Sequence, residues 1–246
     1  EERPLGGTET AIIRLSEALT ELGQEVTVLS SLAVLPITKT LYFPLKRAKE
    51  LGDFDILIVV RGFKGLMLSF NCKKRLFWTG DSFDNLHSLG LGDQRVIQKC
   101  DTFLPVSQWH RDTMCRSANF PLAKTYILRN GIHLADFQGE ETRIRKRLIY
   151  SSSPLRGLEY LPEIFLELKQ RHADLELVVF SSQTVYKAEW PPINVAEDKL
   201  FQRLRSIPGV RVYSPISQAL LARELMKASI WAYPTNFEET SCITAH

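Results

Sequence analysis

Short apolar runs alternate along the chain with segments whose apolar residues recur at helical spacing. The clearest helical segment begins near Gly7 or Thr8, either of which is placed to cap it, and Gly23 is placed to end it. Its apolar face consists of Ala11, Ile12, Leu15, Ala18, Leu19 and Leu22. The apolar runs predict strands at 25–30, 54–60, 75–78, 102–106, 125–128, 148–152, 175–180, 210–213 and 229–233. Further helices are predicted at 161–171, around 197–206 and at 217–227. This alternation predicts a doubly wound α/β architecture with parallel sheets.

A charged stretch interrupts this rhythm near the middle of the chain. It extends from Ala135 to Arg147, contains Gly139 and is dense in acidic and basic side chains, which is typical of a linker. The α/β pattern then starts again. A length of 246 residues, 44% of them hydrophobic, is sufficient for two medium domains. We therefore predict one Rossmann-like domain at 1–136, a linker at 137–147 and a second Rossmann-like domain at 148–246.

The composition of the chain excludes few classes of function, but it narrows the choice of partner, of cysteine chemistry and of cellular location. The chain has 31 basic and 28 acidic residues, and this mild balance argues against a nucleic-acid partner while leaving peripheral contact with a membrane surface open. Cys72, Cys100, Cys115 and Cys242 are scattered, which favours neither a zinc site nor a disulfide framework and fits a reducing, cytoplasmic location. No run approaches the roughly 18 to 20 apolar residues of a membrane span.

Two glycine-containing loops have the composition of phosphate-binding segments. Gly6 and Gly7 precede the first helix, where they allow close approach of a ligand to free backbone N–H groups; a simple helix cap is the alternative. Residues 151–158 follow a predicted strand, are rich in small side chains and carry Arg156 directly before Gly157. Small residues expose N–H groups and arginine offers a fork to phosphate oxygens, so this loop suits a diphosphate; a surface arginine is the alternative.

Other polar residues follow predicted strands. Ser181 comes after 175–180 and either contacts a ligand or ends the strand, and Asp81 lies at the tip of the loop after 75–78 as either a ligand contact or a turn aspartate. The strand 229–233 leads into Pro234, then Glu239, then small residues that are able to open a helix. This arrangement presents a carboxylate and helix N–H groups at the carboxyl edge of a sheet; a plain strand–turn–helix is the alternative.

The order of these motifs resembles that of retaining GT-B glycosyltransferases of the family 4-like group. The matching segments are Gly6-Gly7-Thr8-Glu9, the loop from Trp78 to Asp81, Ser107 before an aromatic-bearing helix, Asn130-Gly131, Arg156-Gly157 and Pro234 to Glu239. In this register Glu239 is the first glutamate of the Glu-x7-Glu motif. The second glutamate would follow His246, so we expect the second domain to be incomplete and donor binding to be weak.

The resemblance implies a GT-B fold, with two Rossmann-like domains whose parallel sheets face a cleft. It implies a retaining, metal-independent glycosyltransferase of the hexosyltransferase type, without a cofactor, that moves a sugar from a nucleotide diphosphate sugar to a hydroxyl acceptor. Glu239 and Asp81 are the catalytic residues by this resemblance. The donor-binding residues are Gly6, Gly7, Ser152, Arg156, Gly157, Ser181, Thr240, Ser241 and Cys242.

Two positions depart from the family pattern. Gly80 stands where the family has a histidine that contacts the donor sugar, and Ser151 stands where it has an arginine. A non-catalytic, GT-B-derived binding module is therefore the first alternative function. A nicotinamide-dependent dehydrogenase is the second, although the chain lacks a strand leading into Gly-x-Gly-x-x-Gly with an acidic residue about 20 positions later.

Overall fold

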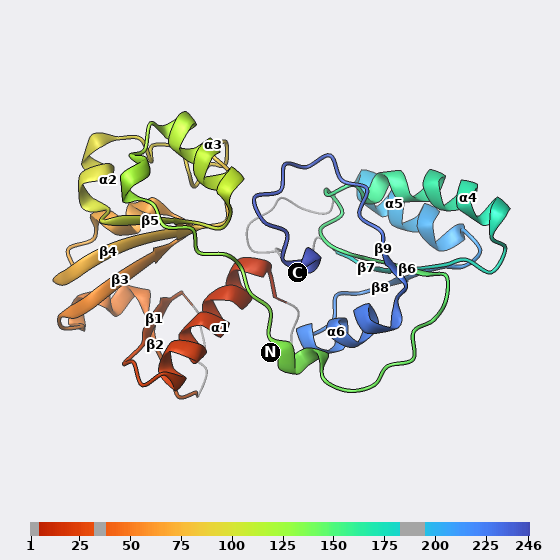
Figure 1. Ribbon diagram of the computed structural model, residues 1–246, viewed down its shortest axis with the longest axis horizontal. Helices are drawn as coiled ribbons and strands as arrows, with labels where there is room; N and C mark the ends of the chain where they lie inside the picture. The colour runs from red at the N-terminus through yellow and green to blue at the C-terminus, as the bar shows by residue number, and fades with distance from the viewer. Residues whose placement is uncertain (1–4, 32–37, 183–194) are drawn as a thin grey trace. The chain divides into compact units, whose positions relative to one another are not determined.

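The computed structural model describes residues 5–31, 38–182 and 195–246, which form two compact units (Figure 1). The amino-terminal unit comprises Ala11–Ile132 and Glu239–His246. The carboxyl-terminal unit comprises residues 5–10 and His133–Glu238, of which 183–194 lie outside the described part. The predicted linker, 137–147, is grouped with the carboxyl-terminal unit, while the domain limits 1–136 and 148–246 stay a prediction.

The described residues up to Ile132 form short parallel strands and three α-helices. The strands are β1 (Thr27–Ser30), β2 (Leu41–Pro44), β3 (Phe54–Val60), β4 (Cys72–Thr79) and β5 (Thr102–Pro105). The helices are α1 (Gly7–Glu21), α2 (Gln94–Lys99) and α3 (Gln108–Ala118), with 3₁₀ turns at Leu45–Glu50, Phe63–Met67 and Leu122–Lys124. Strands β3, β4 and β5 form one parallel sheet in that order, and β1 pairs with β2 in a second.

Alternating side chains of β4 give the larger sheet two buried faces. Phe77 is fully buried with Phe103 and Met114 on the face covered by α2 and α3. Trp78 packs on the opposite face, against Leu15 of α1. Burial on both faces explains why these strands appear in the sequence as nearly continuous apolar runs.

Most local predictions for this unit are confirmed, with three corrections. The strand predicted at 54–60 is β3, and Gly23 ends α1 in a left-handed conformation with φ 84°. Leu22 lies beyond the end of α1 and is 76% exposed, so it does not extend the apolar face. The helix begins at Gly7, which places Gly6 rather than Gly7 or Thr8 before it. The strand predicted at 125–128 is wrong, because that segment makes only an isolated bridge to β5.

The carboxyl-terminal unit has a single four-stranded parallel sheet among its described residues. Its strands are β6 (Arg147–Ser151), β7 (Glu176–Phe180), β8 (Val210–Tyr213) and β9 (Ile230–Trp231), in the order β8-β7-β6-β9. Its helices are α4 (Leu161–Arg171), α5 (Val195–Ser206) and α6 (Gln218–Lys227), with 3₁₀ turns at Leu134–Phe137 and Leu158–Tyr160. The predicted helix 161–171 and strand 210–213 are confirmed, and β9 is shorter than predicted.

Helices cover both faces of this sheet, as a doubly wound fold requires. Tyr150, Leu177 and Phe165 are buried together on the face that α4 and α5 cover. Ile149 and Val178 point to the other face, where α6 packs. The described residues thus confirm the predicted α/β class with parallel sheets.

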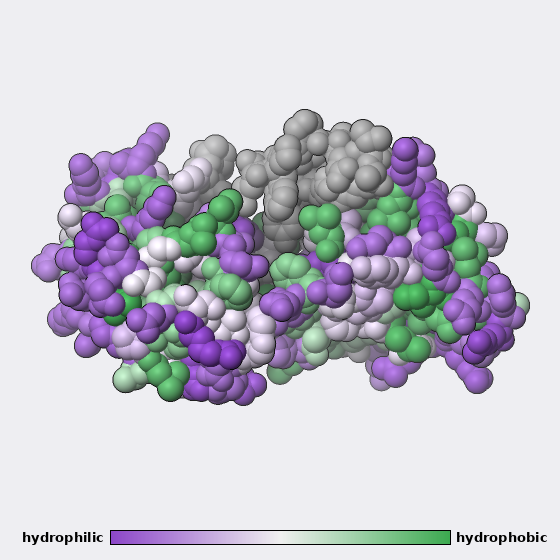
Figure 2. All heavy atoms as spheres, turned by 90° about the horizontal axis from the view of Figure 1, so that it is seen from above, coloured by the Kyte–Doolittle hydropathy of each residue, from purple (hydrophilic) through white to green (hydrophobic). Residues whose placement is uncertain are grey.

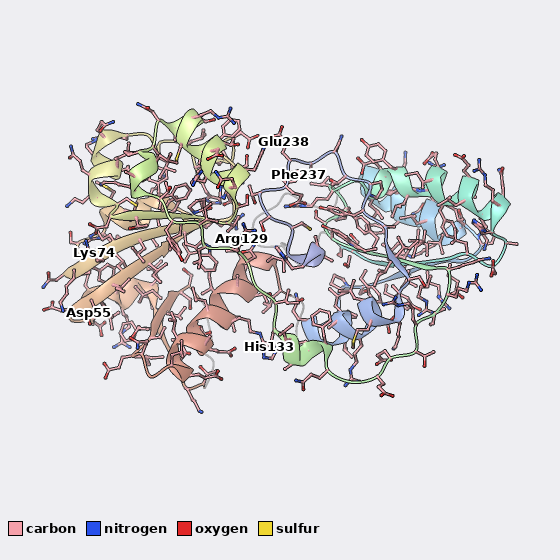
Figure 3. The ribbon with its side chains drawn as sticks, viewed as in Figure 1. Asp55, Lys74, Arg129, His133, Phe237 and Glu238 are labelled. Atoms are coloured by element: carbon pink, nitrogen blue, oxygen red, sulfur yellow. The ribbon has the colours of Figure 1, made fainter. Side chains whose placement is uncertain are left out.

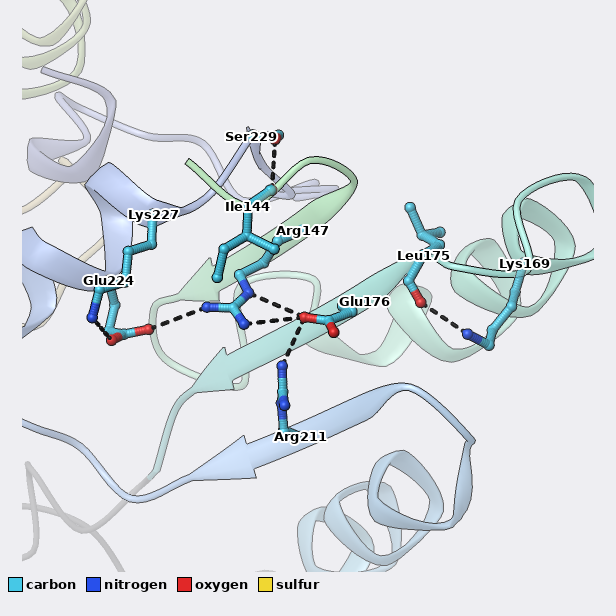
Figure 4. Close-up of polar contacts among 9 residues, drawn as sticks. All are labelled: Ile144, Arg147, Lys169, Leu175, Glu176, Arg211, Glu224, Lys227 and Ser229. Carbon is cyan, nitrogen blue, oxygen red and sulfur yellow. Dashed lines mark hydrogen bonds and ion pairs between the residues drawn. The ribbon is translucent and has the colours of Figure 1, made fainter. Parts of the chain in front are cut away.

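Charged side chains form a network on the α6 face of this sheet (Figure 4). One oxygen of Glu176 accepts from Arg147 at 3.1 Å and from Arg211 at 2.7 Å, joining β6, β7 and β8. Glu224 of α6 lies 3.9 Å from Arg147 and 2.9 Å from Lys227. Arg147 is only 14% exposed, so this network is screened less by solvent than a surface pair. It ties α6 to the amino-terminal half of the strands.

The distribution of polar residues on the surface agrees with the buried cores described above. Figure 2 shows hydrophilic residues spread over the visible surface, with hydrophobic ones scattered among them. Within the described ranges, no helix combines the length and the apolar character that crossing a membrane requires.

We expect Glu176→Gln to lower the free energy of unfolding by about 1–2 kcal/mol, because it leaves two arginines side by side without their shared carboxylate. Urea unfolding at low and high salt measures the loss. Glu167→Gln is the control, since its pair with Arg171 is more than 70% exposed on both sides and contributes under about 0.5 kcal/mol. Equal losses in the two variants would contradict a special role for the network.

Candidate functional site

The strand order of the carboxyl-terminal unit defines a topological switch point. From β6 the chain adds β7 and β8 on one side, and then β9 on the other. The loops that follow β6 and β9 therefore leave neighbouring strands at the same carboxyl edge. In open α/β sheets ligands bind at this kind of position. The two loops contain Arg156, Gly157 and the segment that leads toward Glu239.

The loops after β6 and β9 touch through their backbones at Gly157. This residue has φ 90°, and a Cβ atom added to it would lie 2.2 Å from the carbonyl oxygen of Pro234 and 2.9 Å from Cα of Thr235. A side chain is excluded both by this contact and by the left-handed backbone. The glycine predicted from the sequence as a donor-binding residue is thus required for the two loops to meet.

Side chains extend this contact. The guanidinium carbon of Arg156 lies 4.1 Å from the centre of the Phe237 ring, and the Asn236 amide donates to the Tyr160 hydroxyl at 3.0 Å. The backbone N–H of Phe237 donates to the Thr235 hydroxyl at 3.0 Å, which fixes the turn that carries the ring. Figure 3 labels Phe237 in the segment that follows β9. Arg156 is therefore held by the loop of a different strand.

Hydroxyl groups hold the rest of the loop after β6. The Ser181 hydroxyl donates to the Ser152 carbonyl at 2.6 Å, and the Tyr150 hydroxyl donates to the Ser153 carbonyl at 2.6 Å. Burial, followed by the neighbouring Tyr233, raises the pKa of Tyr150 far above its usual range, so it stays a neutral donor. The Ser151 hydroxyl is buried and makes no hydrogen bond within the described residues. The structure thus brings Ser152 and Ser181 together and orders this loop.

The predicted glycine loop before α1 belongs to the carboxyl-terminal unit and is bonded there to α6. The side-chain amide of Gln218, at the start of α6, donates to the Leu5 carbonyl at 3.4 Å. The Gly6 carbonyl accepts from the N–H of Thr10 at 3.0 Å and from its hydroxyl at 2.9 Å. Gly6 is buried and Gly7, the first residue of α1, is exposed. The amino-terminal end of α1, with its free N–H groups, thus lies at the Gly6-Gly7 loop that the sequence predicted as a binding segment.

Asp81, a predicted catalytic residue, lies after β4 in the amino-terminal unit. Arg61 donates to its carboxylate at 3.0 Å, and its own N–H donates to the Thr79 hydroxyl at 3.0 Å. The carboxylate is 17% exposed. Arg61 has φ 65°, a left-handed conformation that is uncommon for a side chain of this size and places it after β3. The carboxylate is therefore charge-compensated and held in one orientation.

The segment after Glu238 is grouped with this amino-terminal unit. The Thr240 hydroxyl donates to the Gly80 carbonyl at 2.6 Å, and the Ser107 hydroxyl donates to the Thr240 carbonyl at 2.6 Å. The Ser241 carbonyl accepts from the Asn130 amide at 3.2 Å. These bonds bring Thr240 and Ser241 to the carboxyl ends of β4 and β5, beside the Asp81 loop.

Glu239 is half-buried, and the small residues after it lead to a 3₁₀ turn at Ile243–Ala245, which Cys242 precedes. The predicted site residues thus fall into two groups, one in each unit. Arg156, Gly157, Ser152 and Ser181 belong to the carboxyl-terminal unit.

His110 supports the Asp81 loop from α3. Its Nδ1 accepts from the Val106 N–H at 3.2 Å, and its Nε2 lies 2.9 Å from the Asp81 carbonyl. The first bond requires a bare Nδ1, so Nε2 carries the proton and donates. Burial lowers the pKa of His110 from 6.5, and the neutral ring is the form that fits both partners. This histidine is therefore a core residue with both ring nitrogens bonded.

Residues that the sequence did not single out complete both groups. Phe237 contacts Arg156 in the loop after β6, and Tyr160 accepts a hydrogen bond from Asn236 in the loop after β9. Arg61 pairs with Asp81. Arg61 had a usable signal, since it directly follows a buried strand. Phe237 and Tyr160 had no such signal, because their partners are distant in the chain. Phe237 lies 81 residues from Arg156, and Tyr160 lies 76 residues from Asn236.

A separate hollow of about 460 Å³ lies on the α6 face of the carboxyl-terminal sheet. Phe180 and Tyr213, whose rings stack at 5.2 Å, form part of its wall. Most of its charges belong to the Arg147–Glu176 network, and it includes neither Arg156 nor Phe237. Among the described residues, His, Cys, Asp and Glu form no group of three that is arranged to hold a metal ion.

Comparison with known proteins supports the fold. No protein-family model and no curated protein matches the chain. A glycosyltransferase from Rickettsia africae ESF-5 is 12% identical with a TM-score of 0.63, the match covering 95% of this chain and 71% of that one. The lipopolysaccharide outer core galactosyltransferase WaaB is 14% identical with a TM-score of 0.56 and the same coverages.

TarM is 12% identical with a TM-score of 0.55; the match covers 79% of this chain and 39% of TarM. The chain thus spans between 39% and 71% of the length of these three proteins. At such low identity the likeness establishes the fold alone. It confirms the predicted GT-B fold, with Rossmann-like parallel sheets.

We expect Gly157→Ala to lower the free energy of unfolding by about 2–4 kcal/mol, because the new methyl group meets the Pro234 carbonyl and the backbone is left-handed. Gly139→Ala is a matched control: φ is also positive there, at 115°, but nothing lies within 4 Å of the added Cβ. Its loss should be near 1 kcal/mol. Urea unfolding compares the two, and equal losses would contradict the close contact between the loops.

The buried neutral His110 predicts a pH dependence of stability. Its pKa is lower in the folded state than its ordinary value of 6.5, so the unfolded chain takes up the proton first as pH falls. Its stabilising contribution is complete above pH 6.5 and decreases as the pH falls toward its folded-state pKa, with a slope of up to about 1.4 kcal/mol per pH unit.

Denaturant unfolding between pH 7 and pH 5 should show a smaller loss of stability for His110→Asn than for the unaltered chain. His87→Gln is the control, because His87 is exposed. The absolute stability of His110→Asn is not the readout, since that variant also loses packing. Parallel pH profiles for all three proteins would contradict the assignment of a neutral His110.

Proposed function

We propose that this protein transfers a sugar from a nucleotide diphosphate sugar to a hydroxyl acceptor, with retention of configuration and as a hexosyltransferase. The observation that best supports the proposal is the pairing of the Arg156–Gly157 loop with the Pro234–Phe237 loop at the switch point of a GT-B fold. Known glycosyltransferases share this fold, and the motif order in the sequence resembles that of the family 4-like group.

In this proposal Arg156 neutralises the diphosphate of the donor. An arginine donates two parallel hydrogen bonds to phosphate oxygens, and such charge-assisted bonds are shorter and stronger than neutral ones. Gly157 and the serines after β6 let backbone N–H groups approach the same oxygens. As the bond to the sugar breaks, negative charge grows on the leaving diphosphate, and fixed donors of this kind stabilise it. The chemistry is therefore mainly positioning and electrostatic stabilisation.

The predicted catalytic residues act on the sugar side. Arg61 holds the carboxylate of Asp81, and His110 binds its backbone carbonyl. In this proposal the carboxylate accepts a hydrogen bond from a sugar or acceptor hydroxyl. Glu239 supplies the second carboxylate, and Thr240, Ser241 and Cys242 contribute to donor binding. Gly6 and Gly7 provide the positive end of α1.

A non-catalytic GT-B-derived binding module is the second candidate. The observation that favours it is the hydrogen bond that the Thr240 hydroxyl donates to the Gly80 carbonyl. Gly80 stands where the glycosyltransferase family that the sequence resembles has a histidine. Such a module would bind a nucleotide diphosphate without turning over a donor sugar. Release of nucleoside diphosphate from UDP-, GDP- and ADP-sugars separates the two, because only the enzyme produces it.

We expect Arg156→Ala to weaken binding of the matching nucleoside diphosphate about ten- to a hundredfold, equivalent to roughly 1.5–3 kcal/mol for a lost charge-assisted hydrogen bond. The corresponding nucleoside should bind as before, and Arg156→Lys should recover only part of the loss. NMR titration of UDP, GDP and ADP measures these affinities even when binding is weak.

Arg143→Ala is the control, because Arg143 is exposed in the charged stretch before β6 and its removal changes net charge by the same amount. It should leave all affinities within about twofold of the unaltered chain. Equal weakening of nucleoside and diphosphate by Arg156→Ala would indicate a structural arginine. No change for any nucleotide would contradict the proposed function.

A further inference from the structure

The contact between Phe237 and Arg156 has a geometry suited to orienting the arginine. The guanidinium carbon lies 4.1 Å from the ring centre, well inside the roughly 6 Å within which cation–π attraction is significant. Stacking uses the flat face of the guanidinium, whereas its N–H groups lie in the plane and point outward. A ring at this distance restricts the guanidinium without using its N–H donors.

Packing in the described hydrophobic cores does not explain the position of the Phe237 ring. It is 47% exposed and belongs to none of the buried clusters of the carboxyl-terminal unit. An exposed phenylalanine is ordinary by itself. Here, however, its ring lies against the one cation of the loop that follows β6.

The backbone that leads into Phe237 is held at three points. Its N–H donates to the Thr235 hydroxyl, Asn236 binds Tyr160, and Pro234 lies against Gly157. The ring position therefore follows from the pairing of β6 with β9 and not from the arginine alone. Arginine is a long side chain that loses considerable rotamer freedom when it is ordered. A ring that restricts it beforehand reduces this loss when an anion binds.

We propose that Phe237 is a positioning residue that orients the Arg156 guanidinium toward the diphosphate of the donor. This inference rests on the proposed function. The loop after β9 thereby influences phosphate binding through a side chain that does not itself contact the phosphate.

Replacing Phe237 by leucine keeps an apolar side chain but removes the aromatic face. Phe237→Leu should weaken nucleoside diphosphate binding about three- to tenfold and leave nucleoside binding unchanged. Phe237→Trp should retain affinity within about twofold, because indole is the best cation–π partner. The double variant with Arg156→Ala should bind no more weakly than Arg156→Ala alone, since the two residues act as one unit.

Two further readouts separate positioning from general structural damage. The Nε–H resonance of Arg156 should lose its ring-current shift in Phe237→Leu and regain one in Phe237→Trp. The melting temperature of Phe237→Leu should stay within about 2 °C of the unaltered chain, as expected for an exposed side chain.

The outcomes are distinguishable. If Arg156→Ala weakens diphosphate binding but Phe237→Leu does not, the positioning role is overturned and the proposed function stands. Additive losses in the double variant, or equal loss of nucleoside binding in Phe237→Leu, would also overturn it. If Arg156→Ala has no effect, the proposed function fails, and the positioning role that rests on it fails as well.

Discussion

The approach of Gly157 to the Pro234 carbonyl is the constraint on which the candidate site depends. It exists because β6 and β9 are parallel neighbours, so that their loops leave the sheet at the same edge. Only a residue without a side chain and with a left-handed backbone fits there. Once the loops meet, Arg156 and Phe237 come into contact, and Asn236 reaches Tyr160. The position of the single cation in the loop thus follows from strand pairing.

Both groups of site residues consist of polar groups that are already held by the protein. Asp81 is oriented by Arg61 and, through its backbone, by His110. The loop after β6 is ordered by hydroxyl groups of Tyr150 and Ser181. Groups fixed in this way lose little freedom when a ligand arrives, which is the condition for electrostatic stabilisation of a charged leaving group. The ionic network around Glu176, by contrast, lies on a sheet face and serves to hold α6.

The sequence predicted the fold well where the signal was local, and less well where pairing decided the outcome. Strand β3 and helix α4 have their predicted limits, because the apolar run of a buried strand and the period of an amphipathic helix are each visible over the element's own residues. Strand β2 was not predicted, since its pairing with β1 is not visible locally. Residues 125–128 have strand-like composition but form only an isolated bridge to β5. In the site, Arg156 and Gly157 were recognisable by type, whereas Phe237 became evident only through its contact.

The most direct test of the central claim is to map the amide shifts that UDP, GDP or ADP induces in the chain. Binding at the β6–β9 switch point predicts the largest changes in the loops that contain Arg156 and Phe237, with smaller changes in the bare nucleoside titration. The matching nucleotide should stand out from the other two. Changes centred instead on Arg211 and Arg223, at the hollow on the α6 face, would place the diphosphate elsewhere and contradict the account. The absence of shifts with all three nucleotides would contradict it as well.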